Sequence, residues 1–201
     1  MTGRRELTLH SLRLRDERQP AGRRPAPAEL GLVQAFANTF WDLDRRRPER
    51  LRTPAQLAAW LWGRGLLARG VGLDERDLRR ARELREALRA LLLANNGQPR
   101  DPVAVAPLCR VSRGATLRLD AEGHPELAAP RRDLDGALGL LVAIVARAQL
   151  DGRFERLKAC PGPDCGWTFY DASRNRVSTW CSMSICGARV KARHYRARRS
   201  D

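Results

Sequence analysis

Apolar residues recur at helical spacing in several stretches of this chain. Residues 30–43 place leucine, valine and phenylalanine at intervals of three and four, which predicts a helix. Thr53-Pro54 supplies an N-cap and a first helical residue, so a second helix is predicted to start there and to end at residues 63–65. Asp74 caps a third, longer helix that runs to about Asn95, with leucines on its inner stripe and alternating Arg and Glu predicted outside.

The hydrophobic period changes in the middle of the chain. Residues 103–111 are compatible with a short helix or a strand, whereas residues 116–120 alternate like a strand. A Glu-Gly turn signal follows, and residues 125–128 complete a predicted β-hairpin. Residues 133–149 are apolar on more than one side, so we expect a central helix that is buried on most faces and is started by an aspartate.

Composition divides the chain into three parts. Residues 1–27 are rich in Arg and Pro, which predicts a flexible basic segment with at most an edge strand. Residues 28–152 carry the helices and the hairpin, and residues 153–201 carry clustered cysteines and a basic end. We therefore expect an α+β protein, in which a mainly helical N-terminal domain with a small β-hairpin precedes a small cysteine-rich module.

The cysteines near the C-terminus form two pairs: Cys160, Cys165, Cys181 and Cys186. This repeated C-x4-C spacing can place four thiolates at the corners of a tetrahedron and predicts one structural Zn²⁺ site without an open position for a catalytic water. Disulfides are the alternative, and they need an oxidising compartment. The first residues lack an apolar signal segment, so we expect a cytoplasmic protein, where metal binding is favoured. Cys109 stands alone and is expected to be a half-buried apolar residue.

The order of residues around the cysteines predicts the shape of the module. Pro and Gly between Cys160 and Cys165 favour a tight turn, and residues 167–170 are strand-like. A polar turn follows, Val177–Trp180 is predicted to be the return strand, and Cys186 lies at the start of a final helix. A knuckle, a hairpin and a helix with a ligand in its first turn form a treble-clef-like arrangement. The aromatic residues of this stretch are expected to form its small core.

The charge of the chain favours a polyanionic partner. The net charge is +15, and 36 of the 38 basic residues are Arg. Residues 153–201 hold eleven Arg or Lys against four Asp or Glu, a net charge of +7. The longest apolar run, residues 138–146, is far too short to cross a bilayer, so no membrane contact is expected.

Three segments of the module carry a family resemblance: ACPGPDCGWTFYDASRN at 159–175, WCSM at 180–183 and CGAR at 186–189. They resemble the CGNR zinc finger. The part upstream, with Phe-Ala-Asn-Thr at 36–39, is similar to the ABATE domain that precedes this finger in bacterial proteins described as stress-induced transcription regulators. The resemblance implies a zinc-dependent, DNA-binding transcription regulator whose N-terminal domain senses a signal or dimerises.

The sequence departs from the family pattern at two places. Ala188 stands where the eponymous Asn is expected, and Ser178 and Thr179 replace the usual basic pair before Trp-Cys. The four cysteines are unaffected by these changes. If the missing residues help to grip DNA, affinity or specificity is reduced.

The expected nucleic-acid contacts are basic residues of the turn and the final helix: Arg174, Arg176, Arg189, Lys191, Arg193 and Arg196. On a helix, Arg189, Arg193 and Arg196 share one narrow face, from which they can bind phosphates or guanine edges. Two alternatives remain at this stage, a solvated basic tail and a docking site for an acidic protein. A zinc-stabilised RNA- or protein-interaction module without sequence-specific DNA binding is the corresponding alternative function.

The N-terminal domain contains no convincing catalytic set. The three histidines are scattered, and no phosphate loop or nucleophile motif is evident, so we do not expect an enzyme. A small effector could bind between helices, with Asn38, Thr39, Trp41 and Trp60 as candidate lining residues. Packing and helix capping are the competing roles for these four residues.

Overall fold

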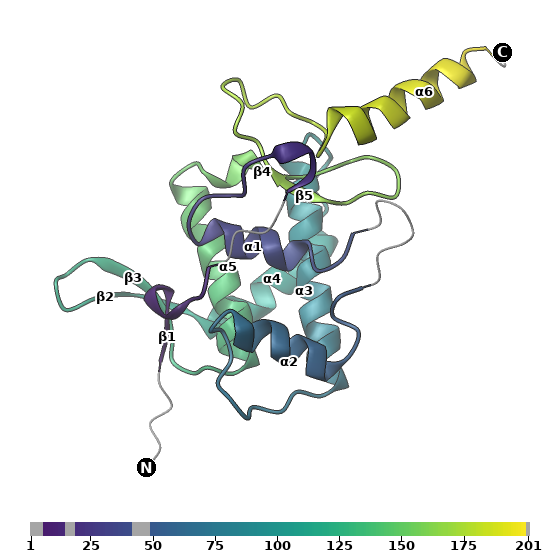
Figure 1. Cartoon of the computed structure of the whole chain (residues 1–201). Helices are drawn as coiled ribbons and strands as arrows, with labels where there is room; N and C mark the ends of the chain where they lie inside the picture. The colour runs from purple at the N-terminus through teal and green to yellow at the C-terminus, as the bar shows by residue number, and fades with distance from the viewer. Residues whose placement is uncertain (1–5, 15–18, 42–48, 200–201) are drawn as a thin grey trace.

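The computed structural model describes residues 6–14, 19–41 and 49–199 of the chain, and Figure 1 shows their arrangement. In chain order the elements are β1 (Leu7–Thr8), α1 (Leu30–Ala37), α2 (Pro54–Gly63), α3 (Glu75–Ala94), α4 (Pro102–Val111), β2 (Thr116–Leu119), β3 (Pro125–Ala129), α5 (Leu134–Leu150), β4 (Leu157–Ala159), β5 (Thr168–Tyr170) and α6 (Ala188–Ala197). Short helical turns lie at Leu9–Ser11, Pro20–Gly22, Ser112–Gly114, Phe154–Arg156 and Met183–Gly187. The fold is α+β, as the sequence predicts.

Side-chain caps start three of the helices where the sequence places them. The Thr53 hydroxyl accepts a hydrogen bond from the backbone N–H of Gln56 at the start of α2. Asp74 and Asp77 form a reciprocal capping box at the start of α3. Asp133 caps α5 by accepting from the N–H of Gly136. Of the two alternatives for residues 103–111, the structure has a helix, α4.

The central helices are α1 and α5. Seven of the eight residues of α1 are buried, and α5 is buried on several sides. Helix α1 ends at Ala37, earlier than predicted, and the Thr39 hydroxyl just beyond it donates to the carbonyl of Phe36. The rest of the predicted helix falls partly on residues 42–48, which lie outside the described part of the chain.

The expectation that every Arg of α3 faces solvent is wrong at two positions. Arg85 and Arg89 have only 3% and 9% of their surface exposed. Arg85 makes a bidentate ion pair with Glu49, with N···O distances of 2.5 and 2.6 Å, and its guanidinium lies 5.2 Å from the Phe40 ring centre. Burial is possible because fixed acceptors meet these guanidinium groups, which helical periodicity does not reveal.

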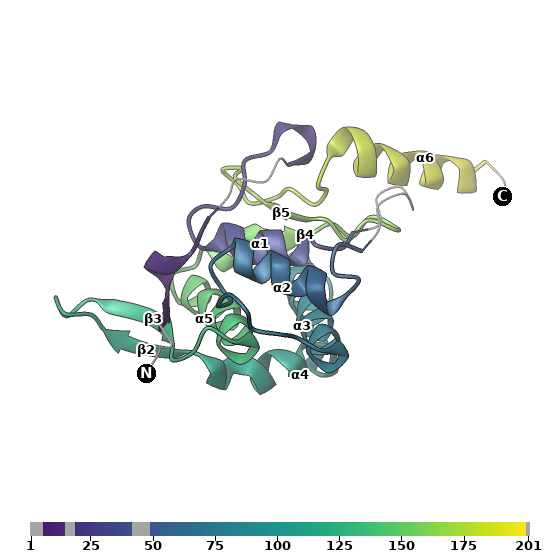
Figure 2. The ribbon, with the colours of Figure 1, turned by 60° about the horizontal axis from the view of Figure 1, so that its bottom comes forward.

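The predicted hairpin forms part of a three-stranded antiparallel sheet with the order β1-β3-β2. Thr116 pairs with Ala128, and the two-residue strand β1 adds to the other side of β3 through Leu7 and Ala129. The N-terminal segment therefore contains the short edge strand that was expected. In Figures 1 and 2 the β2–β3 hairpin projects from the helical body.

The C-terminal module covers one side of the helical body. Figure 2 shows β4, β5 and their loops as a layer over α1, with α3 and α5 on the other side of that helix. The main hydrophobic core continues into this layer, because Phe154, Leu157 and Ala159 belong to the same cluster as the helical leucines. The C-terminal module and the helices thus share one core.

Candidate metal centre

The four paired cysteines converge on one buried point. Their Sγ atoms all lie within 4.8 Å of one another, and the pairs Cys165–Cys181 and Cys181–Cys186 are 3.6 Å apart. A tetrahedron with Zn–S bonds of about 2.3 Å has edges of about 3.8 Å. A disulfide bond is only about 2.05 Å long. The spacing therefore fits four ligands around one zinc ion and does not fit disulfides.

The thiol chemistry also favours a cation at this point. Hydrogen bonds from the Cys165 and Cys181 thiols lower the pKa of Cys160, so one thiolate forms readily. The same contacts, together with burial, raise the pKa values of Cys165 and Cys181, because further thiolates would repel the first. A doubly charged cation removes this conflict and allows all four cysteines to ionise.

The first cysteine pair lies in the turn of a hairpin between β4 and β5. Ala159 pairs with Thr168, and the N–H of Cys160 donates to the carbonyl of Trp167 at 2.9 Å. The turn closes when the N–H of Cys165 donates to the carbonyl of Gly162 at 3.0 Å. This geometry points both sulfurs of the pair toward one side of the turn.

The predicted return strand at Val177–Trp180 is wrong, because β5 pairs with β4 and residues 177–180 form no strand. Side chains satisfy the backbone of this segment in place of a strand ladder. Lys158 donates to the carbonyls of Arg176 and Ser178, and Asn96 donates to the carbonyl of Thr179. Sequence pattern alone does not distinguish a strand from a segment held in this way.

Lys158 and Asp171 form the buried polar centre of the module, which no pattern in the sequence indicates. The ammonium group donates to Asp171 Oδ2 at 2.9 Å, and both side chains are buried. The other Asp171 oxygen accepts from the N–H and hydroxyl of Ser173, while Oδ2 also accepts from the N–H of Ser178. Burial alone would raise the pKa of Asp171, but these hydrogen bonds and Lys158 hold it well below its usual value.

The second cysteine pair starts the C-terminal helix, as predicted. Ser182 follows Cys181 and caps the wide turn Met183–Gly187, since its hydroxyl accepts from the N–H of Ile185 at 3.2 Å. Cys186 lies in this turn, and its N–H donates to the carbonyl of Ser182 at 3.0 Å. Helix α6 continues directly from the turn.

Asn38, a candidate lining residue of an effector pocket, joins the helical part to the metal module. Its amide donates to the carbonyl of Thr168 and accepts from the N–H of the same residue, each at 2.8 Å. Thr39 is buried beside Arg85, and Trp41 meets Trp167 edge to face, with ring centres 4.4 Å apart. Of the two roles considered for these residues, the structure shows packing and hydrogen bonding.

Trp60, the fourth candidate, packs against the helical core, and its ring centre lies 5.4 Å from that of Phe36. Two cavities in the described part of the chain, one beside α3 and one beside α1, are lined by none of the four candidates. Cys109 also differs from expectation, since it is exposed on α4. It does not contribute to the metal centre.

The aromatic residues of the module divide between two cores. Trp167 and Phe169 pack with the cysteines, together with Trp180 and with Trp41 from the helical part. Tyr170 instead packs against the main core. The expectation of a small aromatic core is thus correct for three of the four residues.

Two arginines lie next to the two cysteine turns. Arg23 donates to the carbonyls of Cys181 and Trp180 at 2.7 and 2.8 Å, and its guanidinium lies 4.7 Å from the Phe169 ring centre. Arg89 donates to the carbonyl of Gly166, beside Cys165. A zinc ion with four thiolates has a net charge of −2, which these two cations partly offset. Only their tertiary position identifies them among 36 arginines.

The predicted nucleic-acid contacts lie on two exposed segments of the module. Arg174 and Arg176 lie in the loop after β5, and Arg176 pairs with Glu155 at 3.1 Å. Arg189, Lys191, Arg193 and Arg196 are exposed on α6. The two segments occupy the same end of the molecule in Figure 1.

The fold and the four-cysteine centre define a protein with a structural zinc finger after a mainly helical part. Residues 156–199 match the CGNR zinc finger. Residues 30–151, more than half of the chain, match the ABATE family, described as "Putative stress-induced transcription regulator", and the chain belongs to this family. No curated protein matches the chain in sequence. No helix in the described ranges is long and apolar enough to span a bilayer.

Proposed function

We propose that this protein is a DNA-binding transcription regulator in which α6 contacts the duplex and the helical part senses a signal or dimerises. The family description supports a regulator, and the zinc finger supplies a rigid base for the helix. The net charge of +15 supports a polyanionic partner.

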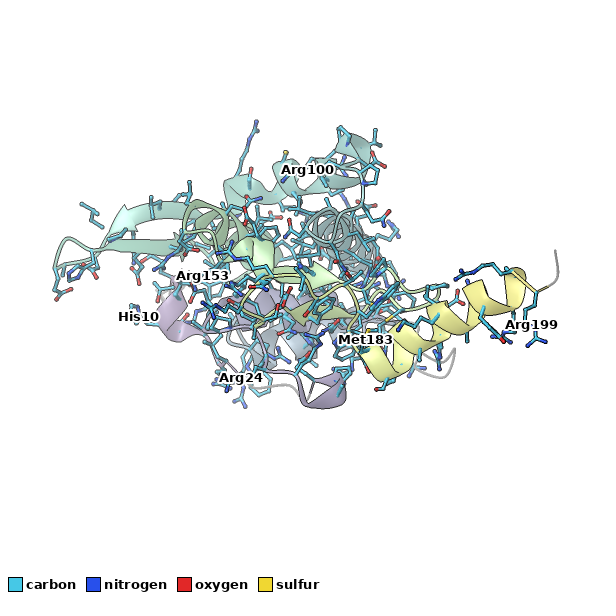
Figure 3. All side chains as sticks on the ribbon, turned by 90° about the horizontal axis from the view of Figure 1, so that it is seen from above. His10, Arg24, Arg100, Arg153, Met183 and Arg199 are labelled. Carbon is cyan, nitrogen blue, oxygen red and sulfur yellow. The ribbon has the colours of Figure 1, made fainter. Side chains whose placement is uncertain are left out.

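The exposure of α6 carries this proposal. From Ala188 to Arg199, the described side chains are exposed except for Val190, which is half-buried. Figure 3 shows the helix extending from the body, with Met183 at its near end and Arg199 at its far end. The same stretch has six basic residues and no acidic one: Arg189, Lys191, Arg193, Arg196, Arg198 and Arg199. A helix presented in this way is suited to a groove lined with phosphates.

The loop after β5 adds a weaker contribution. Arg174 is exposed, whereas Arg176 would have to exchange Glu155 for a phosphate.

Exposed apolar residues at the base of α6, with Met183 at 57% and Ile185 at 37% exposure, favour a second candidate, docking to an acidic protein surface. Binding of random duplex DNA at low salt separates these two functions.

The test compares duplex binding by two double variants at two salt concentrations. Arg189→Ala with Arg193→Ala should weaken binding about tenfold and reduce the salt slope by about 1.8, since two phosphate contacts are lost. The control, Arg76→Ala with Arg79→Ala, removes the same charge from exposed positions at the far end of α3 and should change binding little. Zinc content should stay at one ion per chain in both variants.

Three outcomes would contradict the proposal: no binding of random duplex at low salt, equal losses in both variants, or stronger competition by structured RNA than by duplex DNA. The first, with full zinc content, would favour the protein-docking function. The last would favour an RNA-associated module.

A further inference from the structure

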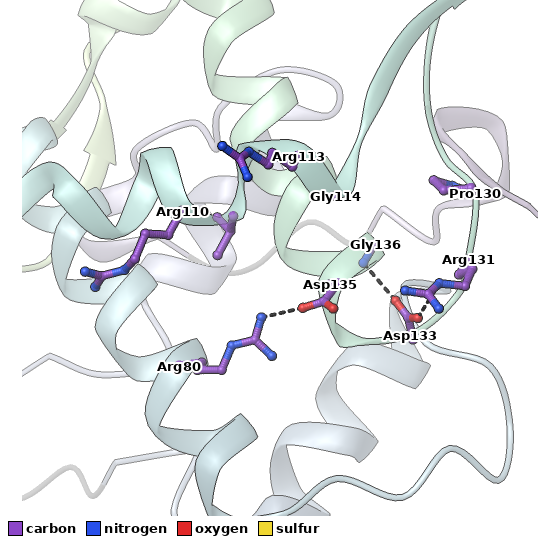
Figure 4. A pocket seen from close by; sticks show the side chains of 10 residues that line it. Arg80, Arg110, Arg113, Gly114, Pro130, Arg131, Asp133, Asp135 and Gly136 are labelled. Carbon is purple, nitrogen blue, oxygen red and sulfur yellow. Dashed lines mark hydrogen bonds and ion pairs between the residues drawn. The ribbon is translucent and has the colours of Figure 1, made fainter.

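A second charged site lies in the helical part, away from the finger. It is a cavity of about 330 Å³ between α3, the end of α4 and the start of α5, shown in Figure 4. Its lining residues are Arg80, Arg110, Val111, Arg113, Gly114, Pro130, Arg131, Asp133, Asp135 and Gly136. This volume lies at the lower end of the range for small-molecule sites.

Arginine is concentrated in this cavity. It supplies four of the ten lining residues, compared with 36 of 201 in the whole chain, and two aspartates offset only part of the charge. Arg80 pairs with Asp135, and Arg131 pairs with Asp133 at 2.9 Å. Each of these two ion pairs has a net charge of zero, so the excess positive charge of the cavity comes from the other two arginines.

The two remaining arginines are held loosely or not at all. Arg110 has one distant ion pair, 3.8 Å from Glu83. The Arg113 side chain is exposed and makes no hydrogen bond or ion pair with any residue in the described ranges. Guanidinium groups that are free to turn can close around an anion with two parallel N–H donors each.

Backbone forms the floor of the cavity. Gly114 and Gly136 lie so close to the carbonyls of Asp135 and Arg131 that a Cβ atom at either position would clash. Asp133 already occupies the first turn of α5 by accepting from the N–H of Gly136, so the helix end is not the anion-binding element. The arginine side chains around this closely packed floor supply the binding groups.

We propose that this cavity binds a small phosphate-bearing compound, with Arg113 and Arg110 as its main ligands and Arg80 at its edge. A phosphate group offers three oxygens to several guanidinium groups at once, which suits this arrangement better than a single carboxylate. The proposal does not depend on DNA binding. Arg80 lies on α3, and Asn95, which caps the end of α3, donates to Phe154 and Leu157 of the C-terminal module. Fifteen residues span about 22 Å along a helix, so the cavity is separate from the finger.

The experiment is titration calorimetry of the whole zinc-loaded protein at fixed ionic strength. Pyrophosphate is the main probe, and inorganic phosphate and succinate are compared with it. Saturable binding in the order pyrophosphate, phosphate, succinate is expected. Arg113→Gln should weaken pyrophosphate binding about tenfold or more. Its control is Arg100→Gln, which removes an exposed arginine outside the cavity and should leave binding unchanged.

A variant that is expected to bind pyrophosphate more tightly provides a second test. Asp135→Asn removes a negative charge from the cavity and releases Arg80, so pyrophosphate should bind more tightly. Equal effects of Arg113→Gln and Arg100→Gln, weaker binding by Asp135→Asn, or no saturable binding of any probe would overturn the proposal. Tighter binding of succinate than of pyrophosphate would also overturn it in favour of a carboxylate site. Duplex affinity of Arg113→Gln should equal that of the wild type, which keeps this test distinct from that of the regulator.

Discussion

Lys158 shows how one buried charge organises the metal module. Its three N–H donors meet three acceptors: a carboxylate oxygen of Asp171 and the carbonyls of Arg176 and Ser178. The ammonium group thereby holds residues 176–178, which pair with no strand, close to β4. A weak signal was present in the sequence, because Lys158 is one of only two lysines in an arginine-rich chain. That signal does not identify the partners, which come from other parts of the module.

Replacing Lys158 with Met should lower the free energy of unfolding by about 3–5 kcal/mol, because Asp171 would remain buried without its cation. Lys158→Arg should rescue little, since a planar guanidinium cannot reproduce three diverging donors. The measurement is urea unfolding of the zinc-loaded protein. The other lysine provides the control, because Lys191→Met changes an exposed residue of α6 and should have almost no effect. Equal effects of the two Met substitutions would refute this role.

At the scale of elements, α1 and α6 are opposite cases. Helix α1 is short and apolar and is stabilised by burial on nearly every side. Helix α6 is equally regular in the structure, yet it has little packing beyond the turn that holds Cys186. A helix of ten residues with so little packing is only marginally stable in water, because nucleation costs more free energy than so few hydrogen bonds return. Binding of a partner should therefore stabilise α6 more than it stabilises α1.

Amide hydrogen exchange tests this difference. In the free protein, residues 191–197 should exchange fast, whereas α1 and the core residues of α5 should exchange slowly. Random duplex DNA at low salt should slow exchange in α6 and leave α1 unchanged. Slow exchange of α6 without any ligand, or no change on adding duplex, would contradict this view of the helix.

At the scale of the whole molecule, the finger and the helical part are interlocked. Asn38 holds β5 by a pair of hydrogen bonds, Arg89 binds the first cysteine turn, and Asn95 donates to the carbonyls of Phe154 and Leu157. Trp41 extends from the helical part into the cysteine cluster. Loss of the metal should therefore be felt in the helices as well as in the finger.

Cys165→Ser should lose zinc and lower the melting temperature of the helical signal by about 10 °C or more, because zinc binding contributes free energy to a shared core. Elemental analysis and thermal melting followed by circular dichroism give both quantities. Cys109→Ser is the matched control, since that thiol is exposed and apart from the centre, and it should keep its zinc and its melting temperature. A zinc-free Cys165→Ser protein with an unchanged helical melt would show that the two parts fold independently.

Local patterns predicted much of the fold. Thr53, Asp74 and Asp133 mark helix starts because a capping group acts on N–H groups only a few residues away. The β2–β3 hairpin follows from period-two alternation and a turn. Long-range polar contacts could not be predicted in this way. Arg23 joins Cys181 across 158 positions, and nothing in its neighbourhood distinguishes it from the other arginines.

The sequence by itself determined the metal centre, the helix starts and the basic end, because each depends on the chemistry and spacing of nearby residues. Tertiary structure decided the partner of β5, the burial of Arg85 and Arg89, and the role of Asn38 as a tie to the finger. It also gathered Arg80, Arg110 and Arg113 around one cavity. These features depend on groups far apart in the chain, and a polar side chain can be buried only where folding delivers its partner.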